Sequence, residues 1–497
     1  MTFTTLTFVI FLAIVFVAYW SVRVRTAQNV LLLVASYFFY AWWDYRFCSL
    51  MLASSLLDYY VGLGLDRARG ARARRVLLWV SLAGNLGMLG FFKYFNFFSD
   101  GLRRLCGSLG WAVDDVTLSV VLPVGISFYT FQTLSYSIDI YRGKIRASRQ
   151  LIEYLAFVSF FPQLVAGPIE RAADLLPQFE RSRRFDPVAA ADGCRQALWG
   201  FFKKMVVADR LALVVNDVYG VGGVGGFGVH GGPAIAFASL AFAFQIYCDF
   251  SAYSDIAIGT ARLFGFGLRR NFAYPFFGQS LGELWRRWHI SMTTWFRDYV
   301  FLPLGGARGG GSAAVRNIMI TYLLIGLWHG ASWTFVCWGG FMGLCFVPEA
   351  LGARWGWGGG RRRQAADDGA SGICGLPSAP VAARMLMTVG LFSFSALFFR
   401  APDIGASMEG ISRVVGDALS PGAYVGVVGL LGEDAGRNAA LVMLFVVAIE
   451  WAQRRHPHPL VIGSWPRWCR WMVYGSLLWA CLMMAPSERE PFIYFNF

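Results

Sequence analysis

The chain has 497 residues, of which 56% are hydrophobic and 17% aromatic, whereas only 15% are charged. A soluble domain carries roughly 25% charged residues, so this composition excludes an ordinary soluble protein and indicates a membrane protein. The formal net charge of +14 does not indicate nucleic-acid binding, because Lys and Arg lie mainly in short segments between apolar runs, as the positive-inside rule describes. The nine cysteines form no C-x-x-C pair, so neither a disulfide framework nor a metal site is predicted.

Long uncharged runs predict membrane-spanning helices. Residues 1–20 and 318–344 carry no charge, and about 20 apolar residues span a bilayer as a helix. The runs lack the alternation of a membrane barrel. Residues 1–20 have no preceding basic region and no A-x-A-like cleavage site, so they predict a first span with an external N-terminus rather than a signal peptide. The candidate spans are 1–20, 29–43, 47–64, 76–95, 117–139, 151–168, 195–215, 233–262, 318–344, 384–400, 436–452 and 471–485.

Basic clusters and breaks between these spans organise the chain. The clusters lie at 23–25, 67–75, 142–149, 361–363 and 454–470. If all are cytoplasmic, both termini are extracytoplasmic. Prolines predict re-entrant or broken helices over 123–137 and 159–170. We expect a single membrane domain over 1–497, since no internal repeat is visible. Its non-spanning parts are a flexible glycine-rich loop at 217–232, an extramembrane loop at 352–381 and an aromatic tail at 486–497.

Two histidines are the strongest functional candidates. Counting from Ile318 at about 1.5 Å per residue places His329 roughly 16 Å deep, near the bilayer centre. An ionisable residue at that depth is functional by default, although a neutral imidazole bonded to a neighbouring helix is the plain alternative. His289 lies in residues 284–299, where helical spacing gives an aromatic stripe (Trp285, Trp288, Met292, Trp295, Tyr299). This pattern predicts one helix at the membrane interface or lining a wet funnel.

A third polar cluster interrupts an apolar span at residues 245–255 (QIYCDFSAYSD). Its carboxylates, Asp249 and Asp255, are six residues apart and face about 120° apart on a helix. We therefore expect each to bond a different neighbour, Arg286, Arg287 or Arg297, rather than to share a proton.

At these residues the sequence resembles the membrane-bound O-acyltransferase family, in its bacterial alginate O-acetyltransferase branch. The resemblance covers nearly the whole chain. It is carried by 37–43 (YFFYAWW), 91–96 (FFKYFN), 122–132 (LPVGISFYTFQ), 161–170 (FPQLVAGPIE), 245–255, 285–301 and 327–330 (LWHG).

The resemblance implies an all-α polytopic fold with about 11–12 membrane helices, plus re-entrant and interfacial helices around a central funnel. It also implies that His329 and His289 are catalytic and that the acyl donor is a cytoplasmic thioester, acetyl-CoA. The remaining site residues predicted are substrate contacts: Trp328, Trp285, Arg286, Gln245 and Asp249. A buried imidazole stays neutral, so His329 can act as a general base or as the acyl carrier.

The chain ends in a short aromatic tail, 491–497 (PFIYFNF). An interfacial anchor is the plain interpretation. The tail also resembles the C-terminal motif of the small membrane partner in the related D-alanyl transfer system. That resemblance implies that Tyr494 relays the acetyl group near His329 to a serine of an extracytoplasmic partner, such as an SGNH-type acetyltransferase.

The expected function is therefore O-acetylation of an exopolysaccharide, such as alginate or cellulose, by an enzyme in the bacterial inner membrane. Peptidoglycan O-acetylation or D-alanyl transfer would use the same machinery. A transporter with His329 in a proton relay and a non-catalytic scaffold of a secretion complex are alternatives from other classes.

Overall fold

The computed structural model describes residues 1–111, 122–165, 167–221, 225–352, 376–484 and 491–493. These residues form helices with no strand among them, which confirms the all-α expectation. The helices pack into two compact units, Met1–Gly200 with Tyr253–Arg269, and Phe201–Ala252 with Arg270–Phe497. The chain passes from one unit to the other within α10 (Pro187–Phe202) and within α12 (Gly232–Leu263).

Six described stretches are long and apolar enough to cross a membrane, judged by length and composition. They are Phe47–Arg67, Ala71–Ser108, Gly232–Leu263, Gly311–His329, Ala379–Phe399 and Asp434–Ala452. Two shorter apolar stretches are Leu6–Ser21 and Pro421–Gly432. The protein is thus a multi-pass membrane protein.

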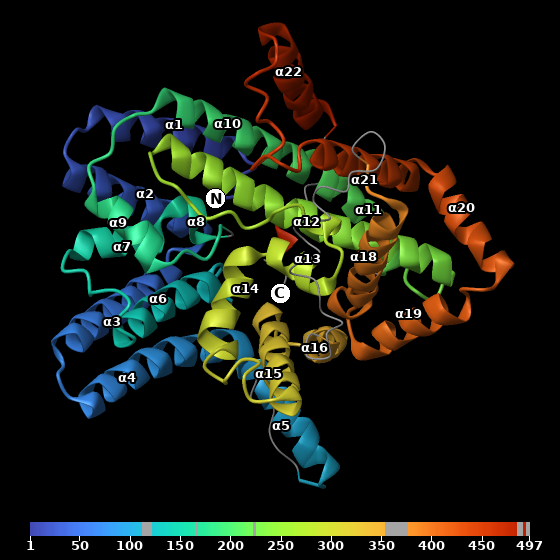
Figure 1. Ribbon diagram of the computed structural model, residues 1–497, viewed down its shortest axis with the longest axis horizontal. Helices are drawn as coiled ribbons and strands as arrows, with labels where there is room; N and C mark the ends of the chain where they lie inside the picture. Colours follow the sequence, from blue (N-terminus) through green and yellow to red (C-terminus); the bar gives the residue numbers. More distant parts are fainter. Residues whose placement is uncertain (112–121, 166, 222–224, 353–375, 485–490, 494–497) are drawn as a thin grey trace. The chain divides into compact units, whose positions relative to one another are not determined.

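The first unit begins with an N-terminal group of helices (Figure 1). Its members are α1 (Leu6–Ser21), α2 (Arg25–Asp44), α3 (Phe47–Arg67), α4 (Ala71–Leu89), the π-helix η1 (Gly90–Tyr94), α5 (Phe95–Ser108), α6 (Ile126–Tyr141), α7 (Leu151–Ser159), α8 (Phe161–Leu164) and α9 (Ala172–Glu180). The predicted break at 159–170 is confirmed, because α7 stops at Ser159 and a separate turn, α8, follows. Of the segment predicted over 117–139, the part from Ile126 is one continuous helix, and residues 112–121 lie outside the described part.

Polar side chains join α3, α4 and α6, which pack against one another. The buried carboxylate of Asp58 accepts hydrogen bonds from Ser81, from Asn85 (2.7 Å) and from Ser137 (2.6 Å). Buried polar groups must be bonded to be tolerated in a membrane, so Asp58 specifies how these helices meet.

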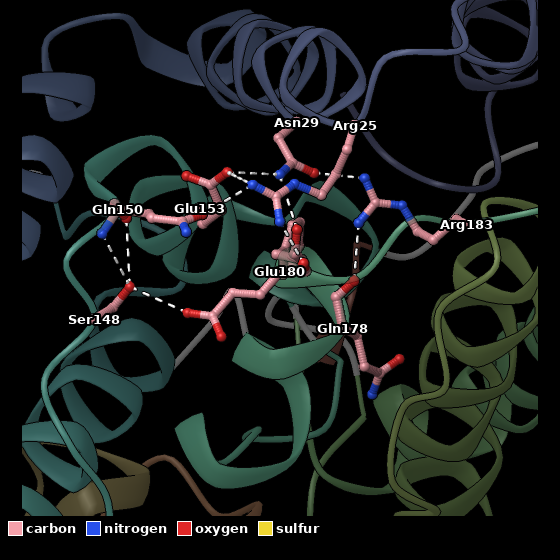
Figure 2. Close-up of polar contacts among 9 residues, drawn as sticks. Arg25, Asn29, Ser148, Gln150, Glu153, Gln178, Glu180 and Arg183 are labelled. Carbon is pink, nitrogen blue, oxygen red and sulfur yellow. Dashed lines mark hydrogen bonds and ion pairs between the residues drawn. The ribbon is translucent and has the colours of Figure 1, made fainter.

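A second polar network links α2, α7 and α9 in the same unit (Figure 2). The buried Asn29 donates to Glu153 (3.3 Å) and to the carbonyl oxygen of Phe179 (3.0 Å). Its own oxygen accepts from Arg183 (2.5 Å). Because these buried polar groups are bonded to one another, we interpret the network as structural: it holds α2, α7 and α9 together.

The second unit contains the remaining helices. They are η2 (Lys203–Ala208), α11 (Asp209–Val218), η3 (Pro275–Phe277), α13 (Leu281–Arg287), α14 (Ile290–Phe296), η4 (Arg297–Phe301), α15 (Gly311–His329), α16 (Trp333–Gly352), α18 (Ala379–Phe399), α19 (Ile404–Gly416), η6 (Pro421–Ala423), α20 (Tyr424–Gly432), α21 (Asp434–Ala452) and α22 (Arg467–Met483). The predicted loop 352–381 lies largely outside the described residues. Within 217–232, the buried Phe227 packs on Tyr219 with ring centroids 4.9 Å apart, so this part of the loop is anchored.

Candidate active site

His329 is the last residue of α15, where the chain turns back into α16. The expectation of one span over 318–344 is therefore wrong, because the helix breaks at residues 330–332. Gly330 takes an extended conformation (φ −165°, ψ 156°), which ends α15 immediately after His329. The imidazole is buried, with 4% of its residue surface exposed. It thus lies at a helix end beside a tight turn, not in the middle of a span.

Glycines allow α15 and α16 to pack closely as a hairpin (Figure 1). A Cβ atom on Gly326 would lie 2.3 Å from the carbonyl oxygen of Phe335. A Cβ atom on Gly339 would lie 2.4 Å from the carbonyl oxygen of Tyr322. Real Cβ atoms do not approach backbone oxygens so closely, so the small residues fix the backbone that carries His329.

Aromatic rings surround the imidazole of His329. The ring centroids of Trp328, Trp338 and Phe399 lie 5.0, 5.1 and 5.0 Å from it. His329 borders a cavity of about 20 Å³, which is room for about one water molecule. The described residues lining it are Phe242, Ala243, Ile246, Trp285, Trp288, His329, Trp338, Phe392, Ser395, Ala396 and Phe399. The cavity is therefore small and mainly apolar, with His329 and Ser395 among its polar residues.

His289 lies at the break between α13 and α14, in a left-handed backbone conformation (φ 40°). The single helix expected over residues 284–299 is thus wrong, since these residues form α13, α14 and the π-helix η4. A non-glycine residue in this region is strained and needs support from its surroundings. That support comes from the buried Asn271, whose carbonyl oxygen accepts from the Ile290 amide (2.9 Å) and whose side chain accepts from Ser291 (2.9 Å).

The His289 imidazole is completely buried among aromatic rings. Its ring centroid lies 4.5 Å from that of Phe250 and 5.7 Å from that of Trp328. Burial lowers the pKa of His289 to about 3, because the charged form loses its hydration. The Trp328 indole contacts the rings of both histidines, and it joins them into one aromatic cluster.

Of the aromatic stripe predicted from Trp285 to Tyr299, the first four members are buried within the protein, whereas Tyr299 is partly exposed. Trp285 and Trp288 line the cavity, whereas Met292 and Trp295 do not appear among its described lining residues. Arg286 is exposed and does not line the cavity. Its neighbour Arg287 forms an ion pair with Glu283, one turn earlier on α13.

Asp249 and Asp255 bond different neighbours, as predicted, but the expected arginine partners are wrong. Asp249 pairs with the ammonium group of Lys204 at 2.9 Å. Asp255, described within the first unit, accepts a 2.7 Å hydrogen bond from Gln196. Gln245 is buried one turn before Asp249 on α12, and neither lines the cavity among its described residues.

Tyr494 lies outside the described residues, but the three residues before it are described. Phe492 is completely buried, and its ring centroid lies 5.7 Å from that of Phe250. The amide of Ile493 donates a 2.8 Å hydrogen bond to Asp249. Since Phe250 also contacts His289, the described part of the tail packs beside the histidine cluster.

Sequence reasoning missed a second set of buried polar residues in this unit. Lys203 donates to the hydroxyl of Ser251 (2.6 Å), and Tyr247 donates to the carboxylate of Glu450 (2.8 Å). The signal that could have revealed part of this set is the pair of adjacent lysines, 203 and 204, inside the predicted span 195–215.

These features define a multi-pass helical membrane protein with two histidines in one buried aromatic cluster. Residues 144–355, which include both histidines, match the membrane-bound O-acyltransferase family. The chain is 43% identical over 328 residues to the probable alginate O-acetylase AlgI of Azotobacter vinelandii, covering 65% of this chain and 63% of that protein. It is 41% identical over 359 residues to the same-named protein of Pseudomonas putida, covering 71% of each.

A peptidoglycan O-acetyltransferase of Helicobacter pylori is 33% identical over 344 residues, which covers 63% of this chain and 62% of that protein. The chain therefore belongs to the membrane-bound O-acyltransferase family, a family of acyl-transferring enzymes. The aligned part spans just under two thirds of the Azotobacter and Helicobacter relatives.

Proposed function

We propose that this chain takes an acetyl group from acetyl-CoA on the cytoplasmic side and delivers it to an extracytoplasmic acceptor protein. The acceptor then O-acetylates an exopolysaccharide, such as alginate or cellulose. The observation that carries this proposal is His329 at the wall of a cavity of about 20 Å³. A cavity of this size admits about one water-sized group, which is the scale of the methyl group of an acetyl. The names of the Azotobacter and Pseudomonas relatives favour alginate.

The proposed step is base-catalysed acyl transfer. The imidazole of His329 accepts the proton of the attacking hydroxyl while that oxygen bonds to the thioester carbonyl carbon. The carbon–sulfur bond then breaks, and the thiolate leaves with the proton that His329 returns. Such catalysis contributes about 10²–10⁴-fold to a rate. In the alternative step, a nitrogen of His329 bonds to the acyl carbon first, the carbon–sulfur bond breaks, and CoA leaves as the thiol with the imidazole proton. The hydroxyl oxygen then takes the acetyl group from the imidazole, and its proton returns to His329.

His289, Trp285 and Trp328 complete the proposed site. Because the pKa of His289 is lowered to about 3, its imidazole is neutral at physiological pH. It can therefore donate or accept a hydrogen bond in the site without adding a charge. Trp285 lines the cavity and Trp328 contacts both histidines, which supports both as substrate contacts. Nothing in the cavity supports this role for Arg286 or Gln245.

We assign Tyr494 as the first acceptor hydroxyl. Its phenol oxygen takes the acetyl group as an ester and then passes it to a serine of an extracytoplasmic SGNH-type partner. The burial of Phe492 and Ile493, the two residues before it, supports a tail that enters the protein. This assignment requires an extracytoplasmic C-terminus, and the proposed topology places both termini on that side of a bacterial inner membrane. Reporter fusions at each terminus test that topology, and a cytoplasmic C-terminus would remove the relay.

The direct test uses proteoliposomes, acetyl-labelled acetyl-CoA and a soluble acceptor. His329→Ala is expected to reduce covalent acetyl transfer at least a hundredfold. His456→Ala, a substitution of an exposed loop histidine, is the matched control and retains transfer. A transporter would move a solute without covalent acetyl turnover, and a scaffold would leave acetylation intact in His329→Ala.

The relay has its own test. Tyr494→Phe is expected to abolish labelling of the chain and of the acceptor, whereas Tyr45→Phe, at an exposed tyrosine, retains both. Mass spectrometry of the trapped wild type is expected to locate the acetyl group on the C-terminal peptide. Undiminished polysaccharide acetylation by Tyr494→Phe would remove the relay from the mechanism.

Peptidoglycan is the second candidate acceptor polymer, because the Helicobacter relative is named for it. The two candidates separate by product. Deletion of the gene is expected to remove O-acetyl groups from the exopolysaccharide and to leave those of peptidoglycan unchanged.

A further inference from the structure

A buried charged cluster lies in the second unit, outside the histidine cavity. The ammonium group of Lys204 lies 2.8 Å from a carboxylate oxygen of Asp209 and 2.9 Å from one of Asp249. All three side chains are at most 3% exposed. Burying charges at membrane depth is expensive unless they are paired, so a cluster of this kind requires an explanation beyond chance.

A π-helix brings the first two members together. In an α-helix, residues five apart face about 140° apart, which would separate Lys204 from Asp209. Here η2 runs from Lys203 to Ala208, and the amide of Asp209 donates to the carbonyl oxygen of Lys204. This wider turn places the two side chains on one face. Short π-helical segments occur frequently at functional sites.

The two oxygens of Asp249 serve two different partners. Oδ1 faces the Lys204 ammonium group at 2.9 Å, while Oδ2 accepts the 2.8 Å hydrogen bond from the backbone amide of Ile493. Lys204 thus places a positive group next to one oxygen of Asp249, while the other oxygen holds the Ile493 amide. A chain segment 244 residues away in sequence is thereby held at this carboxylate.

Packing reinforces the same contact. Phe492 is completely buried against Phe250, the residue after Asp249 on α12. Phe250 also contacts His289, with ring centroids 4.5 Å apart. The segment Pro491–Ile493 is therefore fixed at two points, one polar and one aromatic, next to a histidine of the site.

We propose that Lys204, Asp209 and Asp249 form a buried anchor that holds the C-terminal segment Pro491–Ile493 beside the histidine cluster. The importance of the anchor for acetyl transfer rests on the proposed function, in which Tyr494 is the acceptor. Lys204 and Asp249 are positioning residues, because they act through the tail and not on the reacting atoms. The cluster fixes the tail through its backbone, so the anchor itself does not depend on the side chain of residue 493.

Hydrogen–deuterium exchange of the purified full-length protein tests the anchor without any substrate. Asp249→Ala removes the acceptor of the Ile493 amide and is expected to accelerate exchange of the C-terminal peptide by at least about tenfold. Asp249→Asn keeps an oxygen acceptor and is expected to retain more protection than Asp249→Ala. Asp255→Ala, at a carboxylate on the same helix, is the matched control and leaves tail exchange within about twofold of wild type.

A second variant covers the case in which Asp249→Ala does not fold. Phe492→Ala leaves the charged cluster intact and removes the aromatic contact with Phe250. It is expected to accelerate tail exchange and to lower acetyl transfer, while the exchange of α12 peptides stays unchanged.

Each outcome decides the proposal. Accelerated tail exchange with a matching loss of acetyl transfer supports the anchor and its positioning role. Unchanged tail exchange in Asp249→Ala, or an Asn variant no better protected than the Ala variant, overturns the anchor. Accelerated exchange with undiminished transfer overturns the positioning role. If wild type transfers no acetyl group at all, the proposed function fails, whereas the exchange results still decide the anchor.

Discussion

The indole nitrogen of Trp338 donates a 3.2 Å hydrogen bond to the hydroxyl oxygen of Ser395, which joins α16 to α18 beside His329. The Trp338 ring meets the His329 ring edge-on, with centroids 5.1 Å apart and planes at 87°. Since both Trp338 and Ser395 line the cavity, this hydrogen bond holds the Trp338 side of the cavity in place next to the His329 imidazole.

Ser395→Ala is expected to reduce acetyl transfer several-fold. The substitution removes this acceptor from the buried Trp338 indole, which costs about 1–3 kcal/mol of free energy. The ring is then free to shift relative to His329. Steady-state kinetics with acetyl-CoA check the prediction. Ser395→Thr retains a hydroxyl and is expected to recover most of the activity, and equal losses in both variants would contradict the role of the bond.

Phe399→Leu is expected to widen the acyl preference of the enzyme. Phe399 packs 5.0 Å from His329 and lines the cavity, so a smaller side chain makes room for a longer acyl group. Each buried CH₂ contributes about 0.8 kcal/mol, so the ratio of butyryl to acetyl transfer is expected to rise roughly tenfold. Competition between the two thioesters measures that ratio.

Phe394→Leu is the matched control for the acyl preference. Phe394 lies on the same helix, packs against Phe341 and does not appear among the described lining residues of the cavity. The ratio of butyryl to acetyl transfer by Phe394→Leu is expected to equal that of wild type. An unchanged ratio in Phe399→Leu would mean that another wall limits the acyl group.

The sequence predicted the helical membrane class and the broken segment after Ser159, because these depend on local composition. It also singled out His329 and His289, whose catalytic roles stay predictions. It did not predict the geometry around them. The apolar run 318–344 gives no hydropathy signal for the turn at Gly330, and the left-handed backbone of His289 depends on Asn271, which is 18 residues earlier in the chain. The partner of Asp249 was missed because Lys204 is brought to it by a π-helix and by tertiary packing.

Stability is expected to depend on pH through Glu170, in the loop that precedes α9. Its carboxyl is buried and accepts a 2.7 Å hydrogen bond from the amide of Arg269. Burial raises its pKa to about 8, whereas the unfolded chain titrates near 4.5. Between these values the folded state binds more protons than the unfolded state, so stability falls as pH rises from about 4.5 through 8.

Glu170→Gln removes this titration and keeps an oxygen acceptor for the Arg269 amide. Its unfolding temperature in detergent is expected to exceed that of wild type by a margin that grows from pH 5 to pH 8 and then levels off. Glu433→Gln, at an exposed carboxylate, controls for the substitution. Parallel pH curves for wild type and Glu170→Gln would contradict the prediction.

Two adjacent glycines of α16 are expected to respond oppositely to the same substitution. A Cβ atom on Gly339 would lie 2.4 Å from the carbonyl oxygen of Tyr322, whereas one on Gly340 would meet only a leucine methyl group at 3.8 Å. Gly339→Ala must therefore push α15 away from α16 and displace His329 at the end of the hairpin. Gly340→Ala fits without a clash and gains helix propensity of about 1 kcal/mol. In Gly339→Ala, both the unfolding temperature and the rate of acetyl transfer are expected to fall sharply. In Gly340→Ala, the unfolding temperature is expected to match or exceed that of wild type. Equal behaviour of the two variants would show that the close approach of these helices does not hold His329 in place.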